Sequence, residues 1–177
     1  PTGRNFYSVD TRTVPTPAAW TLGWKSASLL IENHKQEHGE WPKTMALSAW
    51  GTSNMRTGGD DIAQGLALMG VKPTWDTASR RITGFEILPL SILDRPRVDV
   101  TLRVSGFFRD AFPGLIDLFS SASRAVAALD EGEVDNPLSA HVMGEVAELV
   151  EEGMSEDLAK ERAGYRVFGS MPGAYGA

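Results

Sequence analysis

A polar segment between an apolar stretch and an amphipathic helix carries side chains that could bind a ligand. "GTSNMRTGGDD", residues 51–61, follows the apolar "TMALSAW" of residues 44–50. An arginine can hold a carboxylate through two parallel hydrogen bonds, and an aspartate can accept a proton or hold a hydrated metal ion. An exposed indole can lie against a flat ligand. The candidates are Trp50, Thr52, Asn54 and Arg56 for substrate binding, and Asp60 and Asp61 for catalysis. In a purely structural role, Asp60 would be the N-cap of the next helix and Asp61 would lie in its first turn.

A second segment of the same kind follows another predicted strand. "SGFFRD", residues 105–110, comes directly after Val104 and supplies Arg109 for substrate binding and Asp110 for catalysis. In open α/β sheets, ligands bind beyond the carboxyl ends of the strands, in the loops that lead to helices. Arg109 and Asp110 would then complete the wall of a site. The alternative is that they form a salt bridge and begin the helix that contains Phe112.

Two histidines are weak candidates for a metal site. His34 and His38 are four residues apart, which places them on one face of a helix and could let them chelate a metal ion. Both lie near the expected end of that helix, where the helix dipole favours a partly charged histidine. The spacing of the two histidines alone therefore does not decide which residues bind a metal ion.

The nucleotide-binding and hydrolase motifs that would assign a common activity are absent from the sequence. There is no G-x-x-x-x-G-K-[ST] loop, no G-x-G-x-x-G loop after a strand and no G-x-S-x-G elbow. The chain is therefore not expected to bind ATP through a P-loop or to be a hydrolase of the usual types.

The elements that position these residues follow from the spacing of apolar side chains. Strands that alternate with helices predict an α/β fold with a mostly parallel sheet and helices on both faces. Residues 44–50 are nearly continuously apolar, as in a strand buried on both faces. We expect strands over 44–50, around 85–88 and over 98–104, and helices over 18–37, 61–69 and 112–129 and from Pro137 onward. The predicted organisation is an extended N-terminal arm (1–17), an α/β core (18–130) and an acidic helical segment with the start of a following segment (131–177).

Charge is distributed unevenly along the chain. Residues 1–129 carry a net charge of +2, and residues 130–177 carry −8. Because phosphate binding needs clustered lysine and arginine, the acidic end argues against a nucleic-acid partner. Its carboxylates form either a solvated helix face or a docking surface for a basic partner.

The composition predicts a cytoplasmic protein without a membrane span. No apolar run is long enough to cross a bilayer, no signal segment follows Pro1, and the chain has no cysteine, which fits a reducing compartment. The start at Pro1 and the glycine-rich end "GSMPGAYGA" suggest a piece of a longer chain.

Four blocks of the sequence resemble one family. They are "PTGRNFYSVD", "LSAWGTSNMRTGGDDIAQGLALMGVKPTWD", "RPRVDVTLRVSGFFRDAFPGLIDLF" and "RVFGSMPGAYGA". They are similar to the large subunit of aerobic cobaltochelatase and, less closely, to the porphyrin-binding large subunit of magnesium chelatase. The resemblance extends over nearly the whole chain.

The resemblance implies a metal-insertion enzyme. Its large subunit binds a tetrapyrrole and the substrate metal, Co²⁺, while ATP and Mg²⁺ belong to partner subunits, an AAA+ ATPase and its associated subunit. The implied corrinoid is hydrogenobyrinic acid a,c-diamide, on the route to cobalamin. Arg56 and Arg109 would then hold its carboxylates, and Asp60 or Asp61 would position the hydrated metal or accept a pyrrole proton.

Two alternatives remain open. The segment could be a non-catalytic scaffold whose acidic end docks the ATPase subunits, or part of the magnesium chelatase homologue. A site requires Arg56 to be exposed beside a concave surface, whereas a scaffold permits Arg56 to pair internally with Asp60.

Overall fold

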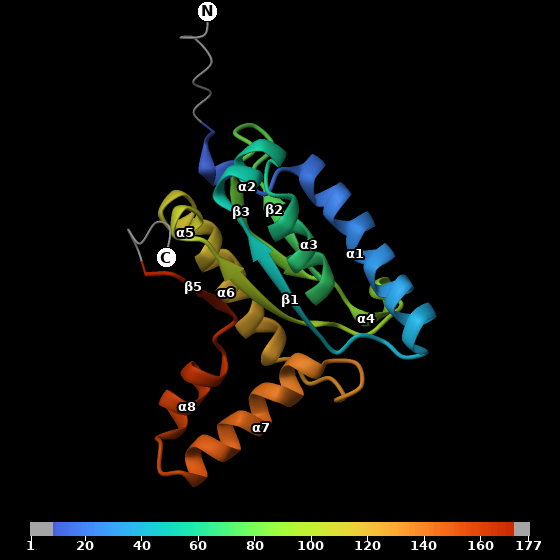
Figure 1. Cartoon of the computed structure of the whole chain (residues 1–177), viewed down its shortest axis with the longest axis vertical. Helices are drawn as coiled ribbons and strands as arrows, with labels where there is room; N and C mark the ends of the chain where they lie inside the picture. Colours follow the sequence, from blue (N-terminus) through green and yellow to red (C-terminus); the bar gives the residue numbers. More distant parts are fainter. Residues whose placement is uncertain (1–8, 172–177) are drawn as a thin grey trace, which may run out of the picture.

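The computed structural model describes residues 9–171 and contains a parallel sheet packed against helices, with a helical hairpin projecting from it (Figure 1). The elements in chain order are η2 (Thr11–Thr13), α1 (Pro17–His38), β1 (Thr44–Ala49), α2 (Gly51–Thr57), α3 (Asp60–Met69), β2 (Val71–Trp75), β3 (Ile82–Ile87), α4 (Leu90–Leu93), β4 (Asp99–Val104), α5 (Gly106–Ala111), α6 (Pro113–Ala127), α7 (Pro137–Glu151), α8 (Glu156–Ala163) and β5 (Val167–Gly169). Residues 1–8 of the predicted arm, and residues 172–177 at the other end, lie outside the described residues.

The main sheet is parallel, as predicted, and has the strand order β1-β4-β5. β1 and β4 pair in register from Thr44 beside Asp99 to Ala49 beside Val104. β5 pairs with the second half of β4, so residues beyond 130 contribute to the same sheet as the core.

A second, two-stranded antiparallel sheet joins β2 to β3. β3 covers the strand predicted around residues 85–88, but it begins earlier, at Ile82. β2 was not predicted, because it has only five residues and one of them is Pro73. A proline within a segment argues against a central strand, since it cannot donate a backbone hydrogen bond.

One face of β1 packs against helices and the other is open. Along the strand, Met45, Leu47 and Ala49 are partly or fully buried, while Thr44, Ala46 and Ser48 are exposed. The prediction that residues 44–50 are buried on both faces is therefore wrong. Ala46 kept the run nearly continuously apolar and Ser48 is small, but small side chains are also tolerated on an exposed face.

The covering helices are those that the spacing predicts. α3 contacts β1, β4 and α6, and α1 packs on α3. Gly23 lets α1 and α3 approach closely, since a Cβ there would stand 2.6 Å from the Cβ of Ala63. α1 begins after Thr16, whose hydroxyl accepts a hydrogen bond from the Ala19 N–H, and ends at Gly39 in the left-handed conformation.

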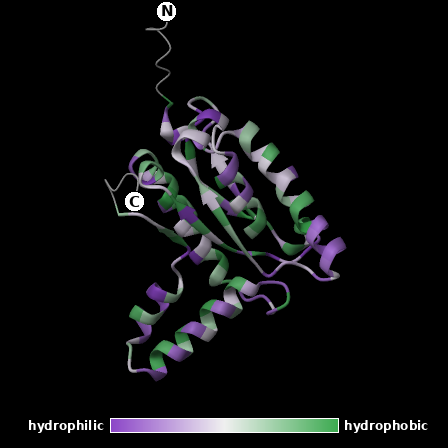
Figure 2. Ribbon diagram, viewed as in Figure 1, coloured by the Kyte–Doolittle hydropathy of each residue, from purple (hydrophilic) through white to green (hydrophobic). Residues whose placement is uncertain are grey.

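Two buried arginines attach the C-terminal third to the sheet. Arg97 donates to both carboxylate oxygens of Glu131 and to the backbone carbonyls of Met69, Gly70 and Leu88. Arg166 donates to both oxygens of Asp99, at 2.6 and 3.2 Å. Helices α7 and α8 nevertheless project away from the core, and hydrophobic residues recur along α7 (Figure 2).

Candidate functional site at the carboxyl edge of the parallel sheet

The structure brings the two predicted segments together. Because β1 and β4 are parallel and end in register, the residues after Ala49 and after Val104 start side by side. The Ser105 N–H donates to the Ala49 carbonyl at 3.3 Å. Gly51 lies so close to the second segment that a Cβ on it would overlap the ring of Phe107. The two segments thus form one continuous surface at the carboxyl edge, which we call the carboxyl-edge site.

Both segments are short helices, α2 and α5, where loops were expected. α5 has a clear local cause, since the Ser105 hydroxyl accepts a hydrogen bond from the Phe108 N–H at 3.1 Å. α2 has no side-chain cap and begins at a glycine, and it contacts α5 and α3. Its helical conformation is therefore set by packing, which a local pattern cannot reveal.

Asn54 lies at the centre of the carboxyl-edge site and is fully buried. Its Nδ2 donates to the Trp50 carbonyl at 2.8 Å and to Oδ2 of Asp61 at 3.1 Å. Its Oδ1 has no hydrogen-bond partner. Asn54 therefore joins α2 to α3 through its amide nitrogen, while its Oδ1 is buried without a partner.

The two aspartates begin α3 in different environments. The N-cap of α3 is Gly59, at φ +100°, so Asp60 is the first helical residue and not the cap. Burial raises the pKa of the Asp61 carboxyl, as does the nearby Asp60, while the hydrogen bond from Asn54 lowers it. Oδ1 of Asp60 is buried without a partner. Both carboxylates gain from the positive end of the helix dipole.

The arginines at the site differ in exposure. Arg56 is exposed, and within residues 9–171 no ion pair joins it to Asp60. Arg109 is half-buried, and its Nε has no hydrogen-bond partner. Asp110 and Thr52 are exposed on α5 and α2.

Two aromatic side chains stand at the surface of the site. Trp50 is 63% exposed, and Phe107 is 39% exposed. Phe107 was missed by the sequence reasoning. The signal was the pair of phenylalanines directly after a strand, of which Phe108 is fully buried and Phe107 remains at the surface.

Unpaired polar atoms distinguish this edge from the rest of the described chain. Among residues 9–171, the buried side-chain atoms without a hydrogen-bond partner are Asn54 Oδ1, Asp60 Oδ1 and Arg109 Nε. All three belong to the two segments that follow β1 and β4. Native proteins leave few buried polar atoms unpaired, and each such atom calls for an explanation. The three atoms are inaccessible to solvent in this structure, so a ligand would reach them only after the side chains turned outward.

The histidine candidates lie elsewhere. α1 ends at His38, just before β1 begins, so His34 and His38 lie toward the amino edge of the sheet. Their ring centroids are 4.4 Å apart, and His34 Nδ1 lies 3.2 Å from the Glu40 carbonyl oxygen. Within residues 9–171 no group of three or more histidine or carboxylate side chains is arranged to hold a metal ion. The pair thus has no third ligand there.

At the same amino edge, His141 Nδ1 lies 2.8 Å from Oδ2 of Asp99, the carboxylate that also accepts hydrogen bonds from Arg166.

None of the helices described is long and apolar enough to cross a membrane.

Comparison with known proteins identifies the family. Residues 1–177 match the family described as CobN/Magnesium Chelatase. The chain belongs to this family. It is 64% identical over 177 residues to the aerobic cobaltochelatase subunit CobN of a Sinorhizobium species and 61% identical to that of Pseudomonas aeruginosa, each match covering 100% of this chain and 14% of the relative.

Other members of the CobN/Magnesium Chelatase family include a magnesium-chelatase protein and a solved structure. The magnesium-chelatase relative, from Cereibacter sphaeroides, is 38% identical over 178 residues, covering 100% of this chain and 14% of the relative. The catalytic subunit of cobaltochelatase from Mycobacterium tuberculosis has a TM-score of 0.90 at 51% identity, covering 100% of this chain and 14% of that chain. The resemblance seen in the sequence is confirmed, and the chain spans 14% of the length of these relatives.

Proposed function

We propose that the chain is part of the tetrapyrrole-binding large subunit of an ATP-dependent cobaltochelatase. The substrate would be hydrogenobyrinic acid a,c-diamide, and the product its cobalt complex, in cobalamin biosynthesis. The observation that carries the placement of the substrate is the pair of exposed aromatic side chains, Trp50 and Phe107, on the same two segments that hold the three unpaired polar atoms. A flat, polar-edged ring system has the surface to cover the two aromatic rings and the peripheral groups to satisfy those atoms.

The proposed roles follow from charge and exposure. Arg56 is exposed and unpaired with Asp60, so its guanidinium can hold a carboxylate at the periphery of the substrate. Arg109 would hold a second polar group through its free Nε. Trp50 would lie against the ring face, and Thr52 and Asn54 Oδ1 would bind further peripheral groups.

Insertion of Co²⁺ into a corrin displaces one ring N–H proton, because the corrin ring binds metal as a monoanion, so this proton must leave as the metal enters. A carboxylate near the ring can accept it. Asp61 suits this role because burial raises its pKa, which makes it a stronger proton acceptor than an ordinary aspartate. Asp60 would orient the hydrated metal ion through its unpaired Oδ1, and Asp110 would complete the acidic wall.

Partner subunits would supply the ATP chemistry. As the family resemblance implies, we assign ATP and its Mg²⁺ to an AAA+ ATPase subunit and an associated subunit of the complex; residues 1–177 themselves contain no P-loop. Cobalt is favoured over magnesium by the relatives, since identity is 64% and 61% to the cobaltochelatase subunits and 38% to the magnesium-chelatase relative. Arg56 is exposed and not paired with Asp60, which meets one of the two conditions that separate a site from a scaffold.

The test is cobalt insertion by the full-length large subunit, assembled with its partner subunits and ATP. Asp61→Asn should lower the rate by about 10²- to 10⁴-fold, as expected for removal of a general base, while the tetrapyrrole still binds. Asp117→Asn, at an exposed carboxylate on α6, is the matched control and should leave the rate unchanged. An unaltered rate in Asp61→Asn would exclude this aspartate from the reaction.

A further inference from the structure

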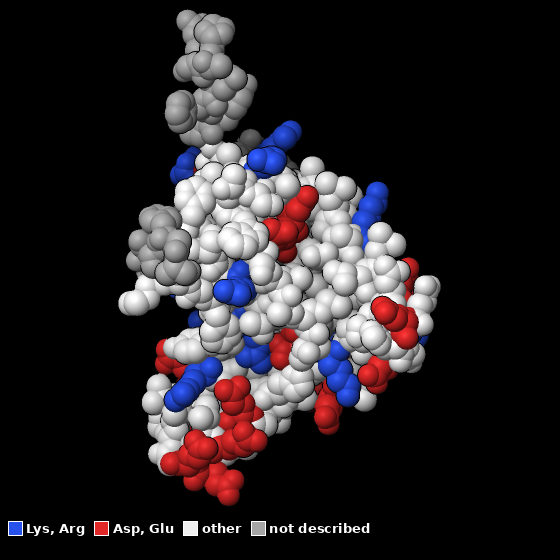
Figure 3. All heavy atoms as spheres, in the orientation of Figure 1, with Lys and Arg blue, Asp and Glu red and all other residues white. Residues whose placement is uncertain are grey.

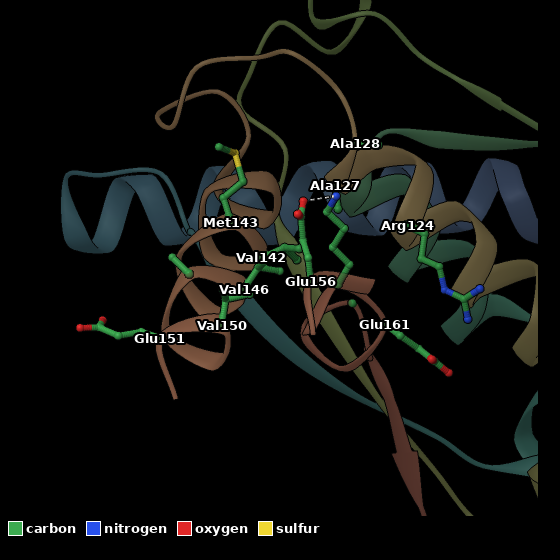
Figure 4. Close-up of a pocket in the computed structure, with 13 residues that line it drawn as sticks. Arg124, Ala127, Ala128, Val142, Met143, Val146, Val150, Glu151, Glu156 and Glu161 are labelled. Atoms are coloured by element: carbon green, nitrogen blue, oxygen red, sulfur yellow. Dashed lines mark ion pairs between the residues drawn. The ribbon is translucent and has the colours of Figure 1, made fainter. Parts of the chain in front are cut away.

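A large apolar groove lies between the projecting helices, far along the chain from the carboxyl-edge site. It has a volume of about 1040 Å³ and is formed by α7, α8 and the end of α6 (Figure 4). Its walls are mainly aliphatic, with Ala127, Val142, Val146, Ala147 and Val150 among the lining residues. We call this cavity the α7–α8 groove.

The groove leaves most of α7 without a covering element. Within α7 the buried residues are Pro137, Leu138 and Ser139, all in the first turn. Further along, Met143 is 68% exposed and Val150 is 42% exposed. Isolated helices of this length are marginal in water, and a stable one normally buries its apolar face. Helices α6 and α8 therefore cover the apolar face of α7 only in part within the described residues.

The rim of the groove is acidic. Glu151, Glu156 and Glu161 lie at its edge. Two cations also line it. Lys160 is already paired with Glu156 at 2.7 Å, and Arg124 on α6 is exposed, so Glu151 and Glu161 outnumber the remaining cation. Figure 3 shows carboxylates gathered over the end of the molecule where α7 and α8 project, in keeping with the charge of −8 on residues 130–177. An occupant with lysine or arginine beside its apolar side would complement this rim.

We propose that the α7–α8 groove receives an amphipathic helix of the same large subunit, from a segment outside residues 1–177. The relatives supply the reason for an internal occupant, since this chain covers only 14% of their length. An aliphatic floor of this kind is typical of permanent contacts, which resemble a domain core. The helix would place aliphatic side chains against Val142 and Val146 and basic side chains beside Glu151 and Glu161. α7 has 15 residues, so its groove face is about 22 Å long and matches about four turns of helix.

This contact depends on family membership and not on the metal-insertion chemistry. Its test uses the full-length large subunit without partner subunits, carrying the photo-crosslinker p-benzoylphenylalanine in place of Met143. The expected result is a crosslink within one polypeptide, joining Met143 to a peptide outside residues 1–177 that contains lysine or arginine. The matched control carries the same crosslinker in place of Glu148, an exposed residue on the outer side of α7, and should lose that crosslink.

Each other result would overturn the proposal. Crosslinks between two copies would assign the groove to a dimer, and crosslinks that need the partner subunits would assign it to the ATPase assembly. A crosslink yield from position 143 no higher than from position 148 would show that no segment occupies the groove. The unaltered protein gives a second measurement: Met143 should resist oxidation by peroxide, and oxidation at the rate of free methionine would contradict an occupied groove.

Discussion

Breaking the buried ion pair between Arg166 and Asp99 should loosen β5 from the sheet. Both side chains are nearly inaccessible, with 9% and 7% of their surfaces exposed, and Asp99 receives two hydrogen bonds from Arg166. Arg166 also donates to the Ala163 and Tyr165 carbonyls, at 2.9 and 2.8 Å. In Arg166→Met these carbonyls lose their donor, and the buried Asp99 carboxylate keeps only His141 as a side-chain partner.

Removing one partner of a buried pair costs about 3–5 kcal/mol, whereas replacing both charges by apolar groups is often neutral. The assay is native-state hydrogen exchange of the full-length subunit, read at the β4 and β5 amides, because local opening can be measured there without global unfolding. At about 1.4 kcal/mol per factor of ten, Arg166→Met should lower their protection by about 100- to 4,000-fold.

Two further variants make this prediction specific. Asp99→Leu combined with Arg166→Met should exchange more slowly than Arg166→Met alone, because no uncompensated charge remains. Arg162→Met, an exposed arginine on the neighbouring α8, should change protection by no more than about twofold. A loss below tenfold in Arg166→Met would refute the reasoning, since the carboxylate would then be satisfied without Arg166.

Three other substitutions test the site and the helix boundaries. Asp61→Asn should stabilise α3 at neutral pH. In the folded protein the pKa of Asp61 is raised above the ordinary 3.8, so the wild type becomes more stable as the pH falls through the folded pKa toward 3.8. The variant should lose this pH dependence, which hydrogen exchange of the α3 amides from pH 7 to 4 would measure. Gly51→Ala should displace the Phe107 ring, lower the free energy of unfolding by about 1–3 kcal/mol and weaken tetrapyrrole binding. Unaltered binding would show that Phe107 does not contact the ligand. Asn136→Ala removes the fully buried N-cap of α7 and should lower the stability of that helix end by about 1–2 kcal/mol, measured as faster hydrogen exchange in the first turn of α7. Ser155→Ala, at the N-cap of α8, is the control and should not affect that turn.

The elements with a strong local signal were predictable from the sequence. Gly39 and Gly70 both end helices in the left-handed conformation, as their positions after apolar periodic segments indicate. The parallel sheet followed from alternating strand and helix patterns, and the two site segments meet because parallel strands end at one edge. β2 and α2 had no such signal, because Pro73 argues against a strand and the polar residues of α2 show no apolar period.

The interactions inside the site depend on distances that spacing does not specify. Asn54 reaches Asp61 across a turn that contains Gly58 and Gly59, both at positive φ, and no pattern of residue types predicts that bond. The tie between Asp99 and Arg166 spans 67 positions of the chain. The open face of β1 was mispredicted because Ala46 and Ser48 are compatible with either environment.

The central claim is that the carboxyl-edge site binds the tetrapyrrole. Its most direct test is a titration of the metal-free corrinoid into the full-length subunit, followed by tryptophan quenching, with Arg56→Ala beside the wild type and Arg162→Ala as the matched control. Loss of charged hydrogen bonds worth about 1.5–3 kcal/mol predicts a fall in affinity of about 10- to 150-fold in Arg56→Ala alone. Equal affinity in all three proteins, with folding unchanged, would contradict the claim and leave residues 50–61 as part of a scaffold.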